Sequence, residues 1–352
     1  MRRLMTGLVL MLAVTVAPAQ AGADQAVLFN NAIRDGGFNE MASEGAERFS
    51  QRTGQGVRQA VITSADDSVN RMEAFIRVGV KHLVLIGWVN APAVRTVAQR
   101  HPTVSFTLID AVVEGGNIRS IEFAEEEAAF LAGIAAGVVS RGGRIGVVAG
   151  MDIPPIQRFV CGFAAGVRHA APAAQLEALV LGQDPTVFRD REAGVRAAQD
   201  LTGRGVDVLF APAGLAGRAA LSEAVRAGAA GIGVDANQNA LHPGRIITSA
   251  VKRVDTAVDR ALTQVAEQQW QAGRYRLGLA EGGVGWSHDQ HNATVIAPAL
   301  PVITAAADAM RNGLLLAPSG PNLMECVTTP GSVEPAVPDG WPVPPSPLAA
   351  AP

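Results

Sequence analysis

The segment Asp35-Gly36-Gly37-Phe38-Asn39 closely follows the apolar run from Ala26 to Phe29, and this combination decides the fold class. The apolar run is too short for a helix and is typical of a buried strand. Two glycines let the backbone turn freely, so a carboxylate, an aromatic ring and a carboxamide are presented together at the end of that strand. Such a set indicates a site for a flat polar ligand. A helix-initiating turn whose Phe38 enters the core explains the same residues.

Short apolar runs alternate along the chain with segments of helical spacing. The runs lie at residues 26–29, 83–86, 104–109, 145–148, 206–210, 232–234 and 246–247. Between the first two, Val69, Met72 and Ile76 form the apolar stripe of a helix. This alternation predicts parallel βαβ layers and therefore an α/β fold.

Polar and aromatic residues recur where the predicted strands end. They are Asp35, Phe38, Asn39, Trp88, Asp110, Asp235 and Lys252. In open α/β sheets ligands bind beyond the carboxyl ends of the strands, so we expect these side chains to form one pocket for a neutral, hydroxyl-rich molecule with a flat ring. Capping of the following helix is the alternative role for any single Asp or Asn at such a turn.

The first 21 residues have the three parts of a secretory signal peptide. Arg2 and Arg3 precede an apolar stretch at residues 8–16, and Ala19-Gln20-Ala21 is a small-x-small cleavage site. No cysteine stands at the cleavage point, and no later apolar run reaches the roughly 20 residues of a membrane span. We therefore expect a soluble periplasmic protein without a lipid anchor.

Charge and motif content argue against nucleic-acid binding and against catalysis. The chain has 29 Lys and Arg against 32 Asp and Glu, with no basic stripe, so no nucleic-acid partner is expected. The glycine-rich segment 142–146 precedes a strand, whereas a phosphate-binding loop follows a strand and opens a helix. The histidines show no metal-ligand spacing, and no Gly-x-Ser-x-Gly elbow occurs. We expect a protein that is not an enzyme.

Cys161 and Cys326 are the only cysteines. An exported chain permits one disulfide between them, and two separate buried thiols explain the residues equally well. From residue 317 to residue 352, Pro, Gly, Ser and Ala dominate. We expect this end to be a flexible extension.

Four blocks of sequence, in order along the chain, resemble the basic membrane protein family. They are residues 35–39, 123–133, 150–167 and 233–239, the last followed by residues 248–253. The third block, which opens Gly150-Met151-Asp152-Ile153-Pro154-Pro155, is similar to the signature segment of that family. The family comprises the substrate-binding proteins of nucleoside ABC importers. The similarity runs from Ala26 to Leu316.

The resemblance implies a type I periplasmic-binding-protein fold, in which two doubly wound Rossmann-like lobes are joined by three crossing strands. We place the crossings near residues 120–123, 249–252 and 282–286. The expected division is a signal peptide (1–21), an N-terminal lobe (24–121 and 252–284), a C-terminal lobe (122–251 and 285–316) and a Pro-rich flexible tail (317–352).

The resemblance also implies roles for the strand-end residues. Phe38 would stack on the base, and Asn39 and Asp110 would hydrogen-bond its edge. Asp235 would accept hydrogen bonds from ribose hydroxyls, as a carboxylate can from two neighbouring groups. The other members of the site would be Asp35, Lys252 and, for a close backbone approach, Gly214.

One residue departs from the family pattern. Family members commonly carry a second aromatic residue at the position that we align with Ala211. The second stacking face is then absent or supplied elsewhere, and Trp88 is a candidate for it.

These observations predict an exported protein that closes two lobes around a nucleoside-like solute, with a purine nucleoside favoured, and delivers it to an ABC permease in the inner membrane. We expect it to act as a monomer. Two alternatives remain open: a sensing module that presents its ligand to a membrane receptor, and an importer component for another flat heterocycle such as a flavin.

Overall fold

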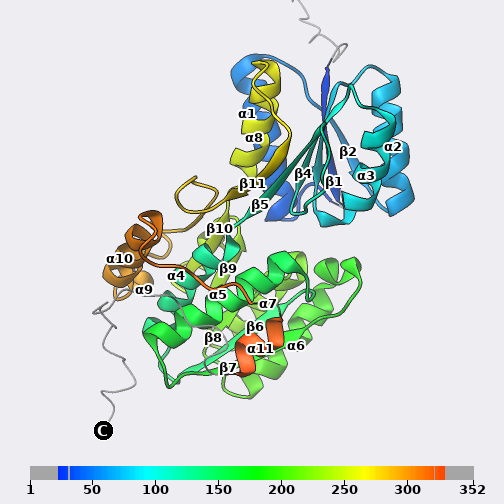
Figure 1. Cartoon of the computed structure of the whole chain (residues 1–352). Coiled ribbons are helices and arrows are strands. Elements are labelled where there is room, and N and C mark those ends of the chain that lie inside the picture. The colour runs from blue at the N-terminus through cyan, green and yellow to red at the C-terminus, as the bar shows by residue number, and fades with distance from the viewer. Residues whose placement is uncertain (1–22, 31, 321, 330–352) are drawn as a thin grey trace, which may run out of the picture.

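The computed structural model describes residues 23–30, 32–320 and 322–329. These residues form two six-stranded sheets, with strand orders β11-β5-β4-β3-β1-β2 and β12-β10-β9-β8-β6-β7. The two orders are the same when each strand is matched to its counterpart, so one connectivity occurs twice. Each sheet with its helices forms a separate lobe (Figure 1). The α/β prediction of two doubly wound lobes is confirmed.

The N-terminal lobe is built on a sheet whose strand pairs are all parallel. Its strands are β1 (Gln25–Asn30), β2 (Arg58–Ile62), β3 (His82–Ile86), β4 (Ser105–Ile109), β5 (Ile118–Phe123) and β11 (Gly273–Leu277). Its helices are α1 (Phe38–Thr53), α2 (Ala65–Arg77), α3 (Ala91–Arg100), α8 (Val254–Ala266) and the short η1 (Trp88–Asn90). Strand β3 is buried along its whole length, because helices cover both faces of a parallel sheet.

The C-terminal lobe repeats this arrangement, except that β12 runs antiparallel to β10. Its strands are β6 (Arg144–Ala149), β7 (Gln175–Val180), β8 (Val208–Phe210), β9 (Ala230–Asp235), β10 (Ile246–Lys252) and β12 (Val284–Trp286). Its helices are α4 (Glu125–Val139), α5 (Pro154–Ala170), α6 (Arg191–Gly203), α7 (Gly214–Arg226), α9 (Ala293–Ile296), α10 (Leu300–Arg311) and α11 (Leu323–Thr328), with the short helices η2 (Pro185–Arg189) and η3 (Asn239–Leu241).

The chain passes between the lobes three times. It leaves the N-terminal lobe from β5 into α4, returns from β10 into α8, and leaves again from β11 into β12 (Figure 1). Because β5 and β10 lead directly into helices of the opposite lobe, the residues at their carboxyl ends lie between the lobes.

Helices α4 and α5 pack unusually closely in the C-terminal lobe. A Cβ on Gly133 would lie 2.2 Å from the carbonyl oxygen of Phe163, and one on Gly166 would lie 2.0 Å from that of Phe130. Only glycine permits this approach of the two backbones. The close packing brings the first turn of α5 beside the first turn of α4, where the chain has just crossed between the lobes.

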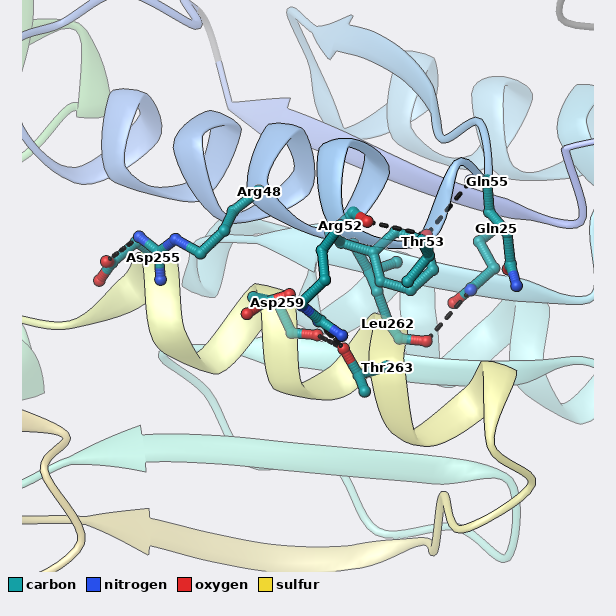
Figure 2. A network of polar contacts seen from close by, with 10 residues as sticks. Gln25, Arg48, Arg52, Thr53, Gln55, Asp255, Asp259, Leu262 and Thr263 are labelled. Carbon is teal, nitrogen blue, oxygen red and sulfur yellow. Dashed lines mark hydrogen bonds and ion pairs between the residues drawn. The ribbon is translucent and has the colours of Figure 1, made fainter.

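Helix α8 is held against α1 by charged side chains along their shared length (Figure 2). Arg48 pairs with Asp255 at 2.6 Å, and Arg52 pairs with Asp259 at 2.7 Å. Gly45 allows the close approach, because a Cβ there would lie 2.3 Å from the carbonyl oxygen of Asp255. These contacts fix the second crossing to the N-terminal lobe.

The C-terminal segment differs from the expected flexible tail, because residues 323–328 form helix α11. A disulfide joins Cys326 in α11 to Cys161 in α5, which excludes the alternative of two separate thiols. Val327 is buried, and Arg168 donates hydrogen bonds to the carbonyl oxygens of Cys326 and Val327 at 2.6 and 2.7 Å. The expectation is therefore wrong for this segment. Residues 330–352 and the expected signal peptide lie outside the described residues.

Candidate functional site

A cleft lies between the lobes at the carboxyl ends of the strands. The residues lining it from the N-terminal lobe are Asn30, Ala32, Asp35, Phe38, Asn39, Gly87, Trp88 and Asp110, with Lys252 from the β10 crossing; from the C-terminal lobe they are Ile153, Pro155, Ile156, Phe159, Pro185, Phe188, Arg189, Pro212, Gly214, Leu215, Val234 and Asp235. The sheets therefore bring together all of the predicted site residues except Ala211.

Asp35 organises the first turn of α1. Its carboxylate accepts hydrogen bonds from the backbone N–H groups of Gly37, Asn39 and Glu40 at 3.0–3.1 Å. It also accepts from Asn39 Nδ2 at 2.8 Å. Asn39 Oδ1 is consequently turned away from Asp35, and it is buried with no hydrogen-bond partner among the described residues. A buried acceptor without a hydrogen-bond partner costs free energy, so a ligand that donates a hydrogen bond to this oxygen is stabilised in the cleft.

Lys252 is a buried cation that lines the cleft. Its Nζ lies 2.6 Å from Asp110 Oδ2 and 2.8 Å from Glu125 Oε1, and Arg158 donates to the other oxygen of Glu125 at 2.5 Å. Burial raises the pKa of Asp110 even though Lys252 opposes it, whereas Lys252 and Arg158 together overcome burial and hold the pKa of Glu125 below its usual range. Asp110 Oδ1 is a second buried acceptor without a described partner.

Three successive glutamates at the start of α4 connect the charged residues of the cleft to the segments that cross between the lobes. Each one binds a different segment: Glu125 binds Lys252 of the second crossing, Glu126 binds Arg276 of β11, and Glu127 accepts from the backbone N–H of Leu279 in the third crossing. The structure shows that these carboxylates tie the three crossings together.

Asp235 lies on the C-terminal side of the cleft at the end of β9. Its backbone is left-handed, with φ of 64°, a conformation uncommon outside glycine and found at constrained sites. Burial raises its pKa to about 7, against the opposing charge of Lys252, and the neighbouring carboxylates of Asp35 and Asp110 add to the rise. Its carboxyl group can therefore change protonation state near neutral pH.

Aromatic rings flank the cleft from both lobes. Phe38 from α1 lies under Lys252, whose Nζ is 4.9 Å from the ring centroid. Trp88 from η1 is a further aromatic residue of the same lobe. Phe188 from η2 lines the cleft on the opposite lobe, and glycines surround it: a Cβ on Gly150 would lie 2.3 Å from its ring, and one on Gly214 would lie 3.4 Å from its Cβ.

The assignment of Ala211 to the site is wrong. Ala211 is fully buried in the core of the C-terminal lobe, and the neighbouring Pro212 lines the cleft instead. The aromatic residue on this side is Phe188, which the sequence interpretation missed because it lies in a short helix after an edge strand and not at a predicted strand end. The sequence feature that could have pointed to this part of the site is the aromatic residue Phe188 itself, which stands four residues after Asp184. Phe159 is buried yet also lines the cleft.

The two walls differ in chemistry. The N-terminal wall offers Asn39 and Asp110 oxygens, whereas Ile153, Ile156 and Leu215 make much of the C-terminal wall apolar. This arrangement can hold a planar ring between aromatic faces and read its edge through acceptors. No cluster of His, Cys, Asp or Glu that could hold a metal ion occurs within the described ranges.

No helix within the described part of the chain is both long and apolar enough to cross a bilayer.

Comparison with known proteins identifies relatives of the whole two-lobed unit. A lipoprotein of Pyrococcus furiosus without an assigned function is 36% identical over 281 residues, which are 75% of this chain and 70% of the relative. A protein of Lactococcus lactis described as an ABC transporter nucleoside-binding protein is 28% identical over 75% of this chain and 80% of its own length. Two further Pyrococcus relatives are also described as lipoproteins, which conflicts with the expectation that this chain lacks a lipid anchor.

A solved structure indicates the same kinship as these relatives. The crystal structure of an ABC transporter solute-binding protein from Aeropyrum pernix superposes with a TM-score of 0.73 at 27% identity, covering 84% of this chain and 94% of that protein. The family of PnrA-like substrate-binding proteins of ABC transporters matches residues 24–297. The chain therefore belongs to this family, named Bmp, as its resemblance to the basic membrane proteins predicts.

Proposed function

We propose that this protein captures a purine nucleoside in the cleft outside the cytoplasm, as a monomer, and delivers it to an ABC permease. The observation that carries the proposal is the pair of buried acceptors, Asn39 Oδ1 and Asp110 Oδ1, which have no partner among the described residues and lie in a cleft flanked by Phe38 and Phe188. A ring that carries N–H groups on its edge satisfies both oxygens while its faces meet the two aromatics.

The remaining polar groups fit a sugar. Asp235 can accept from two neighbouring hydroxyls, and Lys252 supplies a cation beside it. Gly214, with φ of 58°, begins α7 at the cleft wall and leaves room for a ligand to approach the backbone. Trp88 covers the ring from the N-terminal side. The description of the Lactococcus relative as nucleoside-binding supports this class of ligand.

The cysteines also support a location outside the cytoplasm. The sequence has two cysteines, and both are used in the disulfide between Cys161 and Cys326. A disulfide of this kind suits an oxidising compartment outside the cytoplasm.

Mass spectrometry of the small molecules released by denaturing the purified protein tests the proposed ligand. We expect a purine nucleoside at up to one equivalent from the wild type, and none from a Phe38→Ala/Phe188→Ala variant that was expressed and purified in parallel. A flavin in the wild-type extract, absent from the variant, would replace the nucleoside assignment while keeping the site.

A further inference from the structure

The lobes touch at a second place, outside the ligand cleft. The loop Asp35–Gly37 of the N-terminal lobe meets Arg218 of α7 and Gln238, which lies between β9 and η3 in the C-terminal lobe. Arg218 Nη1 is 3.5 Å from the carbonyl oxygen of Asp35, and Gln238 Nε2 is 3.4 Å from that of Gly36. Gly36, Arg218 and Gln238 line a separate hollow, and none of the three lines the ligand cleft.

The N-terminal side of this contact is rigid. Gly36 donates its N–H to Glu40 Oε2 of its own lobe at 2.7 Å, and the Asp35 carboxylate is fully engaged with the first turn of α1. The carbonyl oxygens of Asp35 and Gly36 are therefore held toward the other lobe. Gly36 has φ of 67°, and a Cβ there would lie 1.1 Å from Arg218 Nη1. A larger residue at this position displaces the guanidinium.

The C-terminal side is equally fixed. Gln238 is buried, its backbone N–H donates to Ser249 Oγ at 3.0 Å, and its Oε1 accepts from the backbone N–H of Val234 at 3.3 Å. The side-chain amide is thus oriented so that Nε2 faces the opposite lobe. Val234 immediately precedes Asp235, so the contact lies directly beside the proposed ribose site.

We propose that Arg218 and Gln238 form a closure latch, which binds the carbonyl oxygens of Asp35 and Gly36 and sets the population of the closed protein without touching the ligand. This inference rests on the proposed function in assuming that closure accompanies capture. Because the latch exists only when the lobes are together, it stabilises the closed state by the same amount whatever the ligand is. Apparent affinity scales with the closed fraction, so the latch changes affinity but not selectivity.

The test uses Arg218→Ala and Gln238→Glu in the full-length protein. The second substitution keeps the acceptor for the Val234 N–H and replaces the donor that faces Gly36 with a carboxylate oxygen. Arg226→Ala and Gln199→Ala are the matched controls, because these side chains hydrogen-bond Glu223 within the C-terminal lobe. Calorimetry with inosine and guanosine, and small-angle scattering of the ligand-free proteins, are the two measurements.

We expect each latch variant to weaken inosine and guanosine binding by the same factor, about two- to tenfold, while the controls bind as the wild type does. The ligand-free latch variants should also have a larger radius of gyration. Unequal losses for the two nucleosides, or a radius of gyration that neither variant changes, overturn the latch. If the wild type binds neither nucleoside and the variants still expand, the proposed function fails and the latch stands.

Discussion

Asp110 and Asp235 occupy equivalent positions in the two lobes, each at the carboxyl end of the corresponding strand and each with a left-handed backbone, at φ of 69° and 64°. Their electrostatic surroundings differ. Burial raises the pKa of both groups, that of Asp235 to about 7, and Lys252 forms a direct ion pair with Asp110. The repeated connectivity thus presents two carboxylates to one cleft from opposite sides.

The affinity for a nucleoside should depend on pH through Asp235. If the ionised carboxylate accepts hydroxyl hydrogen bonds, a group whose pKa is about 7 must lose its proton on binding at lower pH. We expect affinity to fall about tenfold from pH 8 to pH 6, as measured by calorimetry. Asp235→Asn should bind more weakly, by about 1.5–3 kcal/mol at pH 8, and show no such dependence. Equal affinity of the two proteins at pH 8 would remove Asp235 from the site.

The same residue should lower the stability of the ligand-free protein at high pH. Its folded-state pKa lies above that of an unfolded aspartate, so the folded protein binds more protons between these values and loses stability as the pH rises through that window. Asp235→Asn should therefore raise the melting temperature at pH 8 more than at pH 5. A uniform shift at both values would contradict the raised pKa.

Lys252 should be required for folding as well as for binding. Lys252→Met leaves Asp110 buried without its cation and leaves Glu125 paired only with Arg158, which we expect to cost about 3–5 kcal/mol in urea unfolding at pH 8. The cost should shrink at pH 5, where Asp110, whose pKa burial raises, can take up a proton more readily. Lys81→Met is the matched control, because Lys81 forms an exposed pair with Asp24 that is worth about 0–1 kcal/mol. Similar losses for both variants would argue against the buried cluster.

Phe188 should supply the stacking face of the C-terminal lobe. Phe188→Ala is expected to weaken nucleoside binding by about 1–3 kcal/mol, which is the usual contribution of an aromatic side chain that stacks on a base. Phe188→Leu keeps apolar bulk against Gly150 and should recover stability but only part of the affinity. Isothermal titration together with thermal melting of the ligand-free proteins separates the two effects. Full recovery of affinity in the leucine variant would exclude stacking.

The disulfide should stabilise the protein without influencing the ligand. Neither Cys161 nor Cys326 lines the cleft, and the bond closes a sequence separation of 165 residues. Cys161→Ala/Cys326→Ala should lose about 2–5 kcal/mol of unfolding free energy while binding the ligand with wild-type affinity. The wild type in reducing buffer should match the variant. A change in affinity would show that α11 reaches the site in some other way.

Much of the fold could be predicted because central strands of parallel sheets are buried on both faces. Strand β3 therefore appears as the continuous apolar run 83–86. Strands β2 and β7 were missed because they lie at the edges of their sheets, where half-exposed residues such as Arg58 and Glu177 interrupt the pattern. Helix α11 was missed because its order depends on a partner far away in the sequence, Cys161.

Residues that line the cleft could be predicted where a side chain ends or directly follows a strand, as Asp235 and Asp110 do. Phe188 could not be placed, because it reaches the cleft from η2 beyond the edge strand β7. The Ala211 assignment failed for a related reason. The chain at Phe210–Ala211 is still in the core, and the cleft wall begins at Pro212.

A parallel calorimetric titration of the wild-type protein with inosine, guanosine, uridine and riboflavin tests the central claim most directly. The account predicts one binding site per chain, with the tightest binding for guanosine, whose N1–H and exocyclic amino group can satisfy Asn39 and Asp110, followed by inosine, whose N1–H can satisfy one of them. Binding should be lost in Phe38→Ala/Phe188→Ala. If neither inosine nor guanosine binds, the assignment of the cleft to a purine nucleoside is contradicted.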